Sequence, residues 1–250
     1  MSEAELDAMD VHGRRVAYRF RKGRSPTLMF LPGYASDMEG GKALALDAFA
    51  ERLGVGLLRI DYSGTGSSGG RFEDGTLAMW LEEALAALDE LTSGPVILVG
   101  SSMGGWLALH LAQLRPERVR ALVGIAAAPD FTDWGFDAKL RAMLESAGRL
   151  GEPNADGSAT PQLMTHAFWE SGQRLRLFDA PEIAVDCPVR LIHGEKDREV
   201  PSDLAFRTMR ALRSSDVQVR IIKGGGHRLS EPNEIEAILD TVESLVERNA

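Results

Sequence analysis

Short apolar runs alternate with amphipathic segments along this chain of 250 residues. The apolar runs are nearly continuous in hydrophobicity, as expected for parallel strands whose sheet is covered by helices on both faces. Six runs predict strands, at residues 27–33, 55–61, 95–100, 121–127, 189–194 and 217–224. Segments with a 3.6-residue period lie between them, the clearest at residues 77–91. The alternation predicts an α/β fold with a mostly parallel central sheet flanked by helices.

One stretch interrupts this alternation. Residues 131–181 contain two helical patterns, at 136–148 and 161–170, but no strand-like run. We interpret the stretch as a small helical lid inserted into one α/β core domain, which comprises residues 1–130 and 182–250. Lids over clefts are commonly apolar, so its aromatic residues are expected to line a substrate pocket, although packing of the lid onto the core would also explain them. These residues are Trp134, Phe136, Phe168 and Trp169.

The sequence Gly100-Ser101-Ser102-Met103-Gly104 matches the G-x-S-x-G pattern. In a nucleophile elbow the serine occupies a cramped turn between a strand and a helix, and the flanking glycines relieve the crowding. A strand pattern precedes the motif and a helical pattern follows it. The motif therefore predicts Ser102, at its central position, as the nucleophile.

A serine hydroxyl needs a neighbouring base, and that base needs a carboxylate to orient it. His227 follows a strand that ends in three glycines, and Asp197 follows the strand at 189–194. The chain order Ser, Asp, His is typical of α/β hydrolases. We predict His227 as the base and Asp197 as its partner, with Asp130 as the competing carboxylate.

Two backbone N–H groups are expected to stabilise the oxyanion of acyl transfer. One belongs to Met103, directly after the nucleophile. The second should come from the loop after the strand at 27–33, where Leu31-Pro32-Gly33-Tyr34 favours the N–H of Tyr34.

Net charge and motif spacing argue against nucleic-acid, cofactor and metal sites. The net charge of −9 argues against a nucleic-acid site, which requires a basic patch. Residues 64–69 match G-x-G-x-x-G, but no helical pattern opens at the third glycine, so we predict a tight turn there and no cofactor. No His, Cys or Asp cluster has metal-ligand spacing, and the lone Cys187 is interpreted as a small buried hydrophobe.

The chain has no apolar run of membrane-spanning length and does not begin with a targeting pattern. We therefore expect a cytoplasmic protein, as a monomer or a homodimer, that acts on a small-molecule or acylated-protein substrate.

Four longer motifs resemble those of a known family. They lie at residues 31–46, 59–70, 100–112 and 191–201. They resemble the α/β-hydrolase-domain family that includes the mitochondrial palmitoyl-protein thioesterase, which also hydrolyses mycophenolic acid acyl-glucuronide. The resemblance covers most of the chain from about residue 25 and is weakest in the lid. It implies a serine esterase or thioesterase whose nucleophile, acid and base fall on Ser102, Asp197 and His227.

We therefore expect a hydrolase that cleaves carboxylic esters or thioesters through an acyl-enzyme on Ser102. Two alternatives stay open. The same fold also supports other chemistry, such as carbon–carbon bond hydrolysis or perhydrolysis, and a homologue that has lost turnover would only bind ligands.

Overall fold

The central element is an eight-stranded sheet in the order β1-β2-β4-β3-β5-β6-β9-β10. The structure, a computed structural model, describes residues 4–155 and 158–249. The strands β1 and β2 are antiparallel to their neighbours, and β3, β4, β5, β6, β9 and β10 are parallel. The strands are β1 Leu6–Val11, β2 Arg14–Arg21, β3 Arg24–Leu31, β4 Val55–Ile60, β5 Val96–Ser101, β6 Val119–Ile125, β9 Val189–Gly194 and β10 Val217–Ile222.

The six strands predicted from apolar runs are confirmed and form the parallel part of the sheet. The antiparallel edge is a hairpin that turns at His12 and Gly13, with φ angles of 53° and 81°. Two central residues with positive φ favour a two-residue turn whose twist matches that of the strands. The mostly parallel α/β-hydrolase architecture is thus as predicted.

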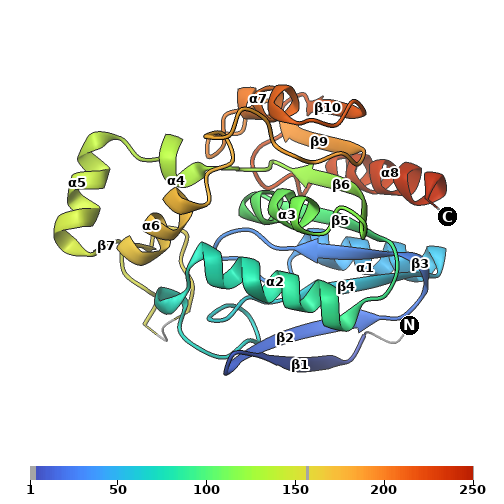
Figure 1. The fold of residues 1–250 in the computed structure, drawn as a ribbon, viewed down its shortest axis with the longest axis horizontal. Helices are drawn as coiled ribbons and strands as arrows, with labels where there is room; N and C mark the ends of the chain where they lie inside the picture. Colours follow the sequence, from blue (N-terminus) through green and yellow to red (C-terminus); the bar gives the residue numbers. More distant parts are fainter. Residues whose placement is uncertain (1–3, 156–157, 250) are drawn as a thin grey trace.

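Helices cover both faces of the sheet (Figure 1). They are α1 Gly41–Leu53, α2 Leu77–Leu91, α3 Met103–Leu114, α7 Asp203–Ala211 and α8 Pro232–Arg248. On β5, Leu98 packs with α2 and α3, whereas Val99 points to the opposite face and packs with α1 and α8. Successive side chains of a strand alternate between faces, so a continuous apolar run supplies both cores at once.

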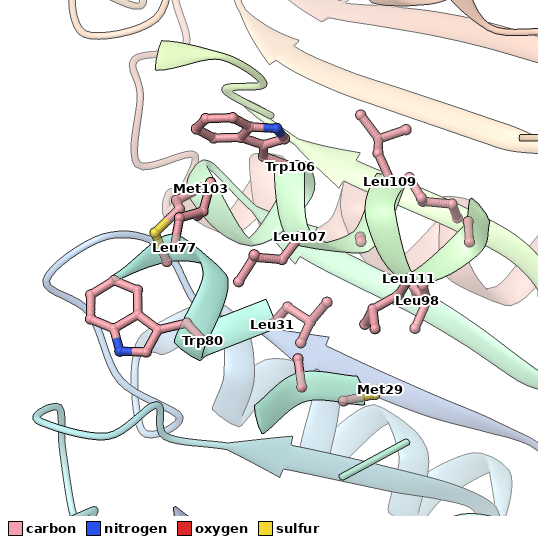
Figure 2. Close-up of a cluster of buried hydrophobic side chains, with 14 of the residues drawn as sticks. Met29, Leu31, Leu77, Trp80, Leu98, Met103, Trp106, Leu107, Leu109 and Leu111 are labelled. Carbon is pink, nitrogen blue, oxygen red and sulfur yellow. The ribbon is translucent and has the colours of Figure 1, made fainter. Parts of the chain in front are cut away.

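The core beneath α2 and α3 holds the largest buried side chains (Figure 2). Trp80 of α2 and Trp106 of α3 are fully buried there, with Met29 and Leu31 of β3 beneath them. Burial of apolar area at about 25 cal/mol per Å² makes this layer a main source of stability. It also fixes α3, whose first turn directly follows Ser102, against the sheet.

Residues 131–181, within the described ranges, add no strand to the main sheet. They form α4 Phe131–Trp134, α5 Ala138–Ala147 and α6 His166–Arg174, and α5 stands out from the body of the molecule (Figure 1). The expectation of no strand was wrong in one detail, because β7 Arg149–Leu150 and β8 Met164–Thr165 form a short antiparallel pair. The division into a core and a lid stays a prediction.

The start of α6 also differs from the periodicity, which predicted a helix from residue 161. Thr165 accepts a hydrogen bond from the N–H of Phe168 at 3.1 Å and so caps the helix. An N-terminal Thr cap satisfies an N–H that has no partner within the helix, and this local hydrogen bond sets the boundary.

Candidate active site

Ser102 lies on a sharp turn between β5 and α3. Its φ and ψ of 53° and −119° are in a region that L-residues rarely adopt. The close approach of neighbouring backbone explains the glycines on either side. A Cβ on Gly100 would lie 2.3 Å from the carbonyl oxygen of Gly104, and one on Gly104 would lie 2.0 Å from that of Leu31. The turn exposes the Ser102 side chain at the carboxyl edge of the sheet.

His227 links the other two predicted residues. Its Nε2 lies 3.1 Å from Oγ of Ser102, and its Nδ1 lies 2.8 Å from Oδ2 of Asp197. The side chain of His227 is 16% exposed and that of Asp197 is fully buried. The structure therefore brings Ser102, His227 and Asp197 into one hydrogen-bonded line, in the geometry that general-base activation of a serine requires.

A close packing of two loops carries His227 to Asp197. The N–H of Lys196 donates to the carbonyl oxygen of Gly225 at 2.8 Å. A Cβ on Gly194 would lie 2.4 Å from that same oxygen, so this contact depends on a glycine at the end of β9. The loop after β10 thus docks on the loop after β9, and His227 lies beside Asp197 although 30 residues separate them.

Asp197 accepts four hydrogen bonds. His227 and His193 donate to Oδ2, the latter from Nε2 at 3.1 Å, and the N–H groups of Glu199 and Val200 donate to Oδ1 at 2.9 Å each. Burial opposes ionisation of this carboxyl, but the hydrogen bonds from His193, His227 and Val200 outweigh it and hold its pKa well below the ordinary range. Asp197 is therefore a fixed anion next to the imidazole of His227.

The protonation of His193 follows from its neighbours. Its Nε2 faces Oδ2 of Asp197 and also the carbonyl oxygen of Val200, at 3.0 Å. Both atoms are acceptors, so Nε2 carries the hydrogen. The His193 side chain is 1% exposed.

The backbone N–H groups of Tyr34 and Met103 donate no hydrogen bond to any group among the residues that the structure describes. Both flank Ser102: Met103 follows it directly, and a Cβ on Gly33, the residue before Tyr34, would lie 3.3 Å from Cβ of Ser102. Two unused donors beside a serine hydroxyl are what an oxyanion hole requires.

Asp61 holds the loop that carries Tyr34. The carboxylate accepts the N–H of Met38 at 2.7 Å on one oxygen and the N–H of Ser67 at 2.7 Å on the other. It thereby ties the loop after β3 to the glycine-rich turn at 64–69. Burial raises the pKa of Asp61 to about 6, although the two N–H groups act in the opposite direction.

The four aromatic residues predicted to line a pocket lie in different environments. Phe168 is buried, with its ring centroid 4.9 Å from that of Tyr34. Trp169 donates its indole N–H to the carbonyl oxygen of Thr132, and Phe136 packs partly buried against the main core. Trp134 lines an open groove. Their roles toward a substrate stay predictions.

Asp130, the competing carboxylate, faces another part of the chain. It accepts the N–H groups of Leu177 and Phe178, each at 2.8 Å, and it makes no hydrogen bond to His227. Burial raises its pKa. Asp130 therefore fixes the segment that leads back from residues 131–181 to β9.

Sequence reasoning missed two contributors. Neither His193 nor Asp61 was assigned a role from the sequence; they lie at the ends of the predicted strands at 189–194 and 55–61. The signal for His193 is its spacing of four residues from Asp197 across a tight loop. The signal for Asp61 is a carboxylate followed by the glycines at 64 and 66, which let the chain fold back over it.

Among the described residues, no group of three or more His, Cys, Asp or Glu side chains could hold a metal ion. Within the same ranges, no helix has both the length and the apolar character needed to cross a membrane.

The fold and this site define a class. Residues 28–240 match the alpha/beta hydrolase family, and the chain belongs to that family. It is therefore a hydrolase.

The chain is similar to three proteins whose names state an activity or a family. The chain is 39% identical over 236 residues to human palmitoyl-protein thioesterase ABHD10, mitochondrial, with 93% of this chain and 77% of the relative covered. The solved structure of alpha/beta hydrolase domain-containing protein 10 from mouse matches with a TM-score of 0.90 and 37% identity, over 98% of this chain and 99% of that one.

A third relative has a different stated substrate. Pimeloyl-[acyl-carrier protein] methyl ester esterase of Xanthomonas campestris pv. campestris is 38% identical, with 82% of this chain and 89% of the relative covered. The human relative is named as mitochondrial, so the cytoplasmic location stays a prediction.

Proposed function

We propose that this protein hydrolyses carboxylic esters or thioesters through an acyl-enzyme on Ser102. The observation that carries the proposal is the continuous line of hydrogen bonds from Ser102 through His227 to Asp197. The names of the relatives, one a thioesterase and one a methyl ester esterase, support acyl transfer to water as the reaction class.

In the first half-reaction, His227 accepts the hydroxyl proton of Ser102 as Oγ attacks the carbonyl carbon. The negative charge that develops on the carbonyl oxygen is stabilised by the N–H groups of Tyr34 and Met103, each worth about 100- to 1000-fold in rate for a typical oxyanion donor. Asp197 stabilises the imidazolium of His227. When the tetrahedral intermediate collapses, the bond from carbon to the leaving oxygen or sulfur breaks, and His227 protonates that atom.

In the second half-reaction, water attacks the acyl-serine. His227 removes a proton from the water, and the same two N–H groups stabilise the second tetrahedral intermediate. The carboxylic acid is released, and the proton returns to Oγ of Ser102. No cofactor is needed in either half.

Aromatic packing beside the site favours an apolar acyl group. The ring of Tyr34 lies within 6 Å of the rings of Phe72, Trp80, Phe131 and Phe168. An acyl chain that enters beside Ser102 would meet this cluster. The proposal therefore favours acyl chains over small polar acids, with acyl-protein thioesters and acyl-glucuronides among the substrate candidates.

Labelling with a fluorophosphonate probe tests the nucleophile. Wild-type protein should be labelled, Ser102→Ala should not, and Ser101→Ala, which removes the neighbouring hydroxyl in the same motif, should be labelled as wild type is. Loss of His227 should lower kcat by roughly 10⁴- to 10⁶-fold, because triad members act as a unit. Full labelling of Ser102→Ala would refute the proposal.

A further inference from the structure

A groove of about 640 Å³ opens between α4 and α7. Its apolar lining is formed by the indole of Trp134, the buried side chain of Leu204, and Phe206. Pro201 and three charged residues of α7 complete the lining, namely Asp203, Arg207 and Arg210.

Both sides of the groove are anchored on the candidate triad. The N–H of Ala128 donates to the carbonyl oxygen of Ser102 at 3.1 Å, and the indole N–H of Trp134 donates to the carbonyl oxygen of the next residue, Pro129, at 2.7 Å. On the other side, Pro201 directly follows Val200, whose N–H is bonded to Asp197. The groove is therefore linked to Ser102 through backbone carbonyl groups and to Asp197 through the segment that ends at Pro201.

The two arginines of the groove are available to an anion. Neither Arg207 nor Arg210 forms an ion pair or a hydrogen bond within the described residues, and both are exposed. Arg207 lies with its guanidinium 3.9 Å from the ring centroid of Phe178, which fixes its direction. The lining contains two guanidinium groups and one carboxylate, that of Asp203. The groove is therefore positively charged, although the whole protein has a net charge of −9.

Sheet topology places the groove on the leaving-group side of the reaction. The oxyanion loop with Tyr34 follows β3, Ser102 follows β5, Trp134 follows β6, and Pro201 follows β9. Three rings of the aromatic cluster, those of Tyr34, Phe72 and Trp80, lie in the segments that follow β3 and β4. His227, which would protonate the leaving atom, follows β10. With the acyl group on the Tyr34 side, the leaving group extends across β6 toward β9, where the groove lies.

We propose that this groove binds the phosphate-bearing part of a thiol leaving group, so that acyl thioesters of phosphorylated thiols are preferred substrates. The inference rests on the proposed function of Ser102. Guanidinium groups bind phosphate through paired N–H donors, and the apolar lining contacts the uncharged arm that joins the phosphate to the sulfur. In the reaction, the carbon–sulfur bond breaks, His227 protonates the sulfur, and the phosphorylated thiol leaves through the groove.

The test compares octanoyl-phosphopantetheine with octanoyl-pantetheine, which have the same acyl group and the same thioester. For the wild-type protein, KM should be at least about tenfold lower for the phosphorylated substrate, which corresponds to about 1.4 kcal/mol. Arg207→Gln combined with Arg210→Gln should abolish this difference and leave kcat for the unphosphorylated substrate unchanged. Added salt should raise KM for the phosphorylated substrate alone.

A matched double variant controls for net charge. Arg24 and Arg120 are exposed arginines at the amino ends of β3 and β6, far from the carboxyl edge that carries Ser102. Arg24→Gln with Arg120→Gln removes the same charge and should keep the preference. Equal KM values for the two substrates in wild type, or a preference that survives loss of Arg207 and Arg210, would overturn the inference.

Calorimetry with phosphopantetheine, the thiol product, separates the groove from the reaction. Its affinity for wild type should exceed that of pantetheine at least about tenfold, and the difference should disappear with the double change at Arg207 and Arg210. If neither thioester is hydrolysed but this binding pattern holds, the proposed function is wrong and the phosphate-binding role of the groove still stands. If both thioesters are hydrolysed and the phosphate adds nothing to binding, only the phosphate-binding role of the groove is wrong.

Discussion

His193 donates its Nε2 hydrogen to the Oδ2 atom of Asp197 at 3.1 Å, the same oxygen that His227 contacts at 2.8 Å. Two imidazoles therefore share one carboxylate oxygen. His193 belongs to β9 and His227 to the loop after β10, and the side chain of Asp197 that they contact is completely buried. This arrangement makes His193 a positioning residue for Asp197, and it leads to the first prediction.

His193→Leu should lower kcat/KM at least about tenfold, because a hydrogen bond to a charged group of about 1.5–3 kcal/mol is lost. Loss of this donor leaves more negative charge on Oδ2 to stabilise the imidazolium. The acid limb of the pH profile of kcat/KM should therefore move to higher pH. His193→Gln, whose amide can donate, should restore part of the rate and shift the limb less. An unchanged limb in His193→Leu would reduce His193 to a packing role.

Asp61 should make stability fall as pH rises from about 4 to about 6. Its folded-state pKa is about 6, whereas an aspartate of the unfolded chain titrates near pH 4, so the folded state alone holds the proton in this window. The free energy of unfolding should decrease across it by about 3 kcal/mol from this group. Urea unfolding from pH 4 to 7 measures the slope.

The matched variants for this prediction are Asp61→Asn and Asp74→Asn. The first should remove the decrease, because a neutral amide replaces the titrating carboxyl, and the second changes an exposed aspartate by the same charge. If Asp61→Asn keeps the wild-type slope, another group is responsible.

Tyr34→Phe tests the role of the Tyr34 hydroxyl separately from the role of the Tyr34 backbone N–H. The hydroxyl donates a hydrogen bond to the carbonyl oxygen of Leu163, which tethers the loop after β3 to the segment before α6. Loss of this bond should lower the free energy of unfolding by about 1–3 kcal/mol. The backbone N–H remains, so kcat should stay within about threefold of wild type. A loss of several orders of magnitude would show that the hydroxyl acts in the reaction.

Gly104→Ala should disrupt the elbow. The added Cβ would lie 2.0 Å from the carbonyl oxygen of Leu31, in backbone that cannot move without shifting β3. We expect a loss of roughly 3 kcal/mol or more in thermal or urea unfolding, with loss of fluorophosphonate labelling. Gly41→Ala, where the new Cβ meets open space, is the control and should fold and label as wild type does. A stable, labelled Gly104→Ala protein would contradict the close packing at the elbow.

Much of the fold could be predicted from the sequence. The strands follow from apolar runs, and α2 was located at Leu77–Leu91 as the periodicity indicated, because burial of one face is encoded locally by the spacing of apolar residues. The short α4 and the pair β7–β8 were not anticipated, because two- to four-residue elements carry no period that a sequence can reveal.

The candidate site divides in the same way. The sequence by itself was enough to predict Ser102, since its motif, the strand before it and the helix after it are contiguous, and chain order favoured Asp197 and His227. Only the tertiary structure decided that His193 shares the Asp197 carboxylate, that Asp61 holds the loop after β3, and that two arginines of α7 line a groove with Trp134 of α4. The reason is physical: each of these depends on loops from separate strands that meet at one edge of the sheet, and no local pattern of polar and apolar residues records which loops will touch.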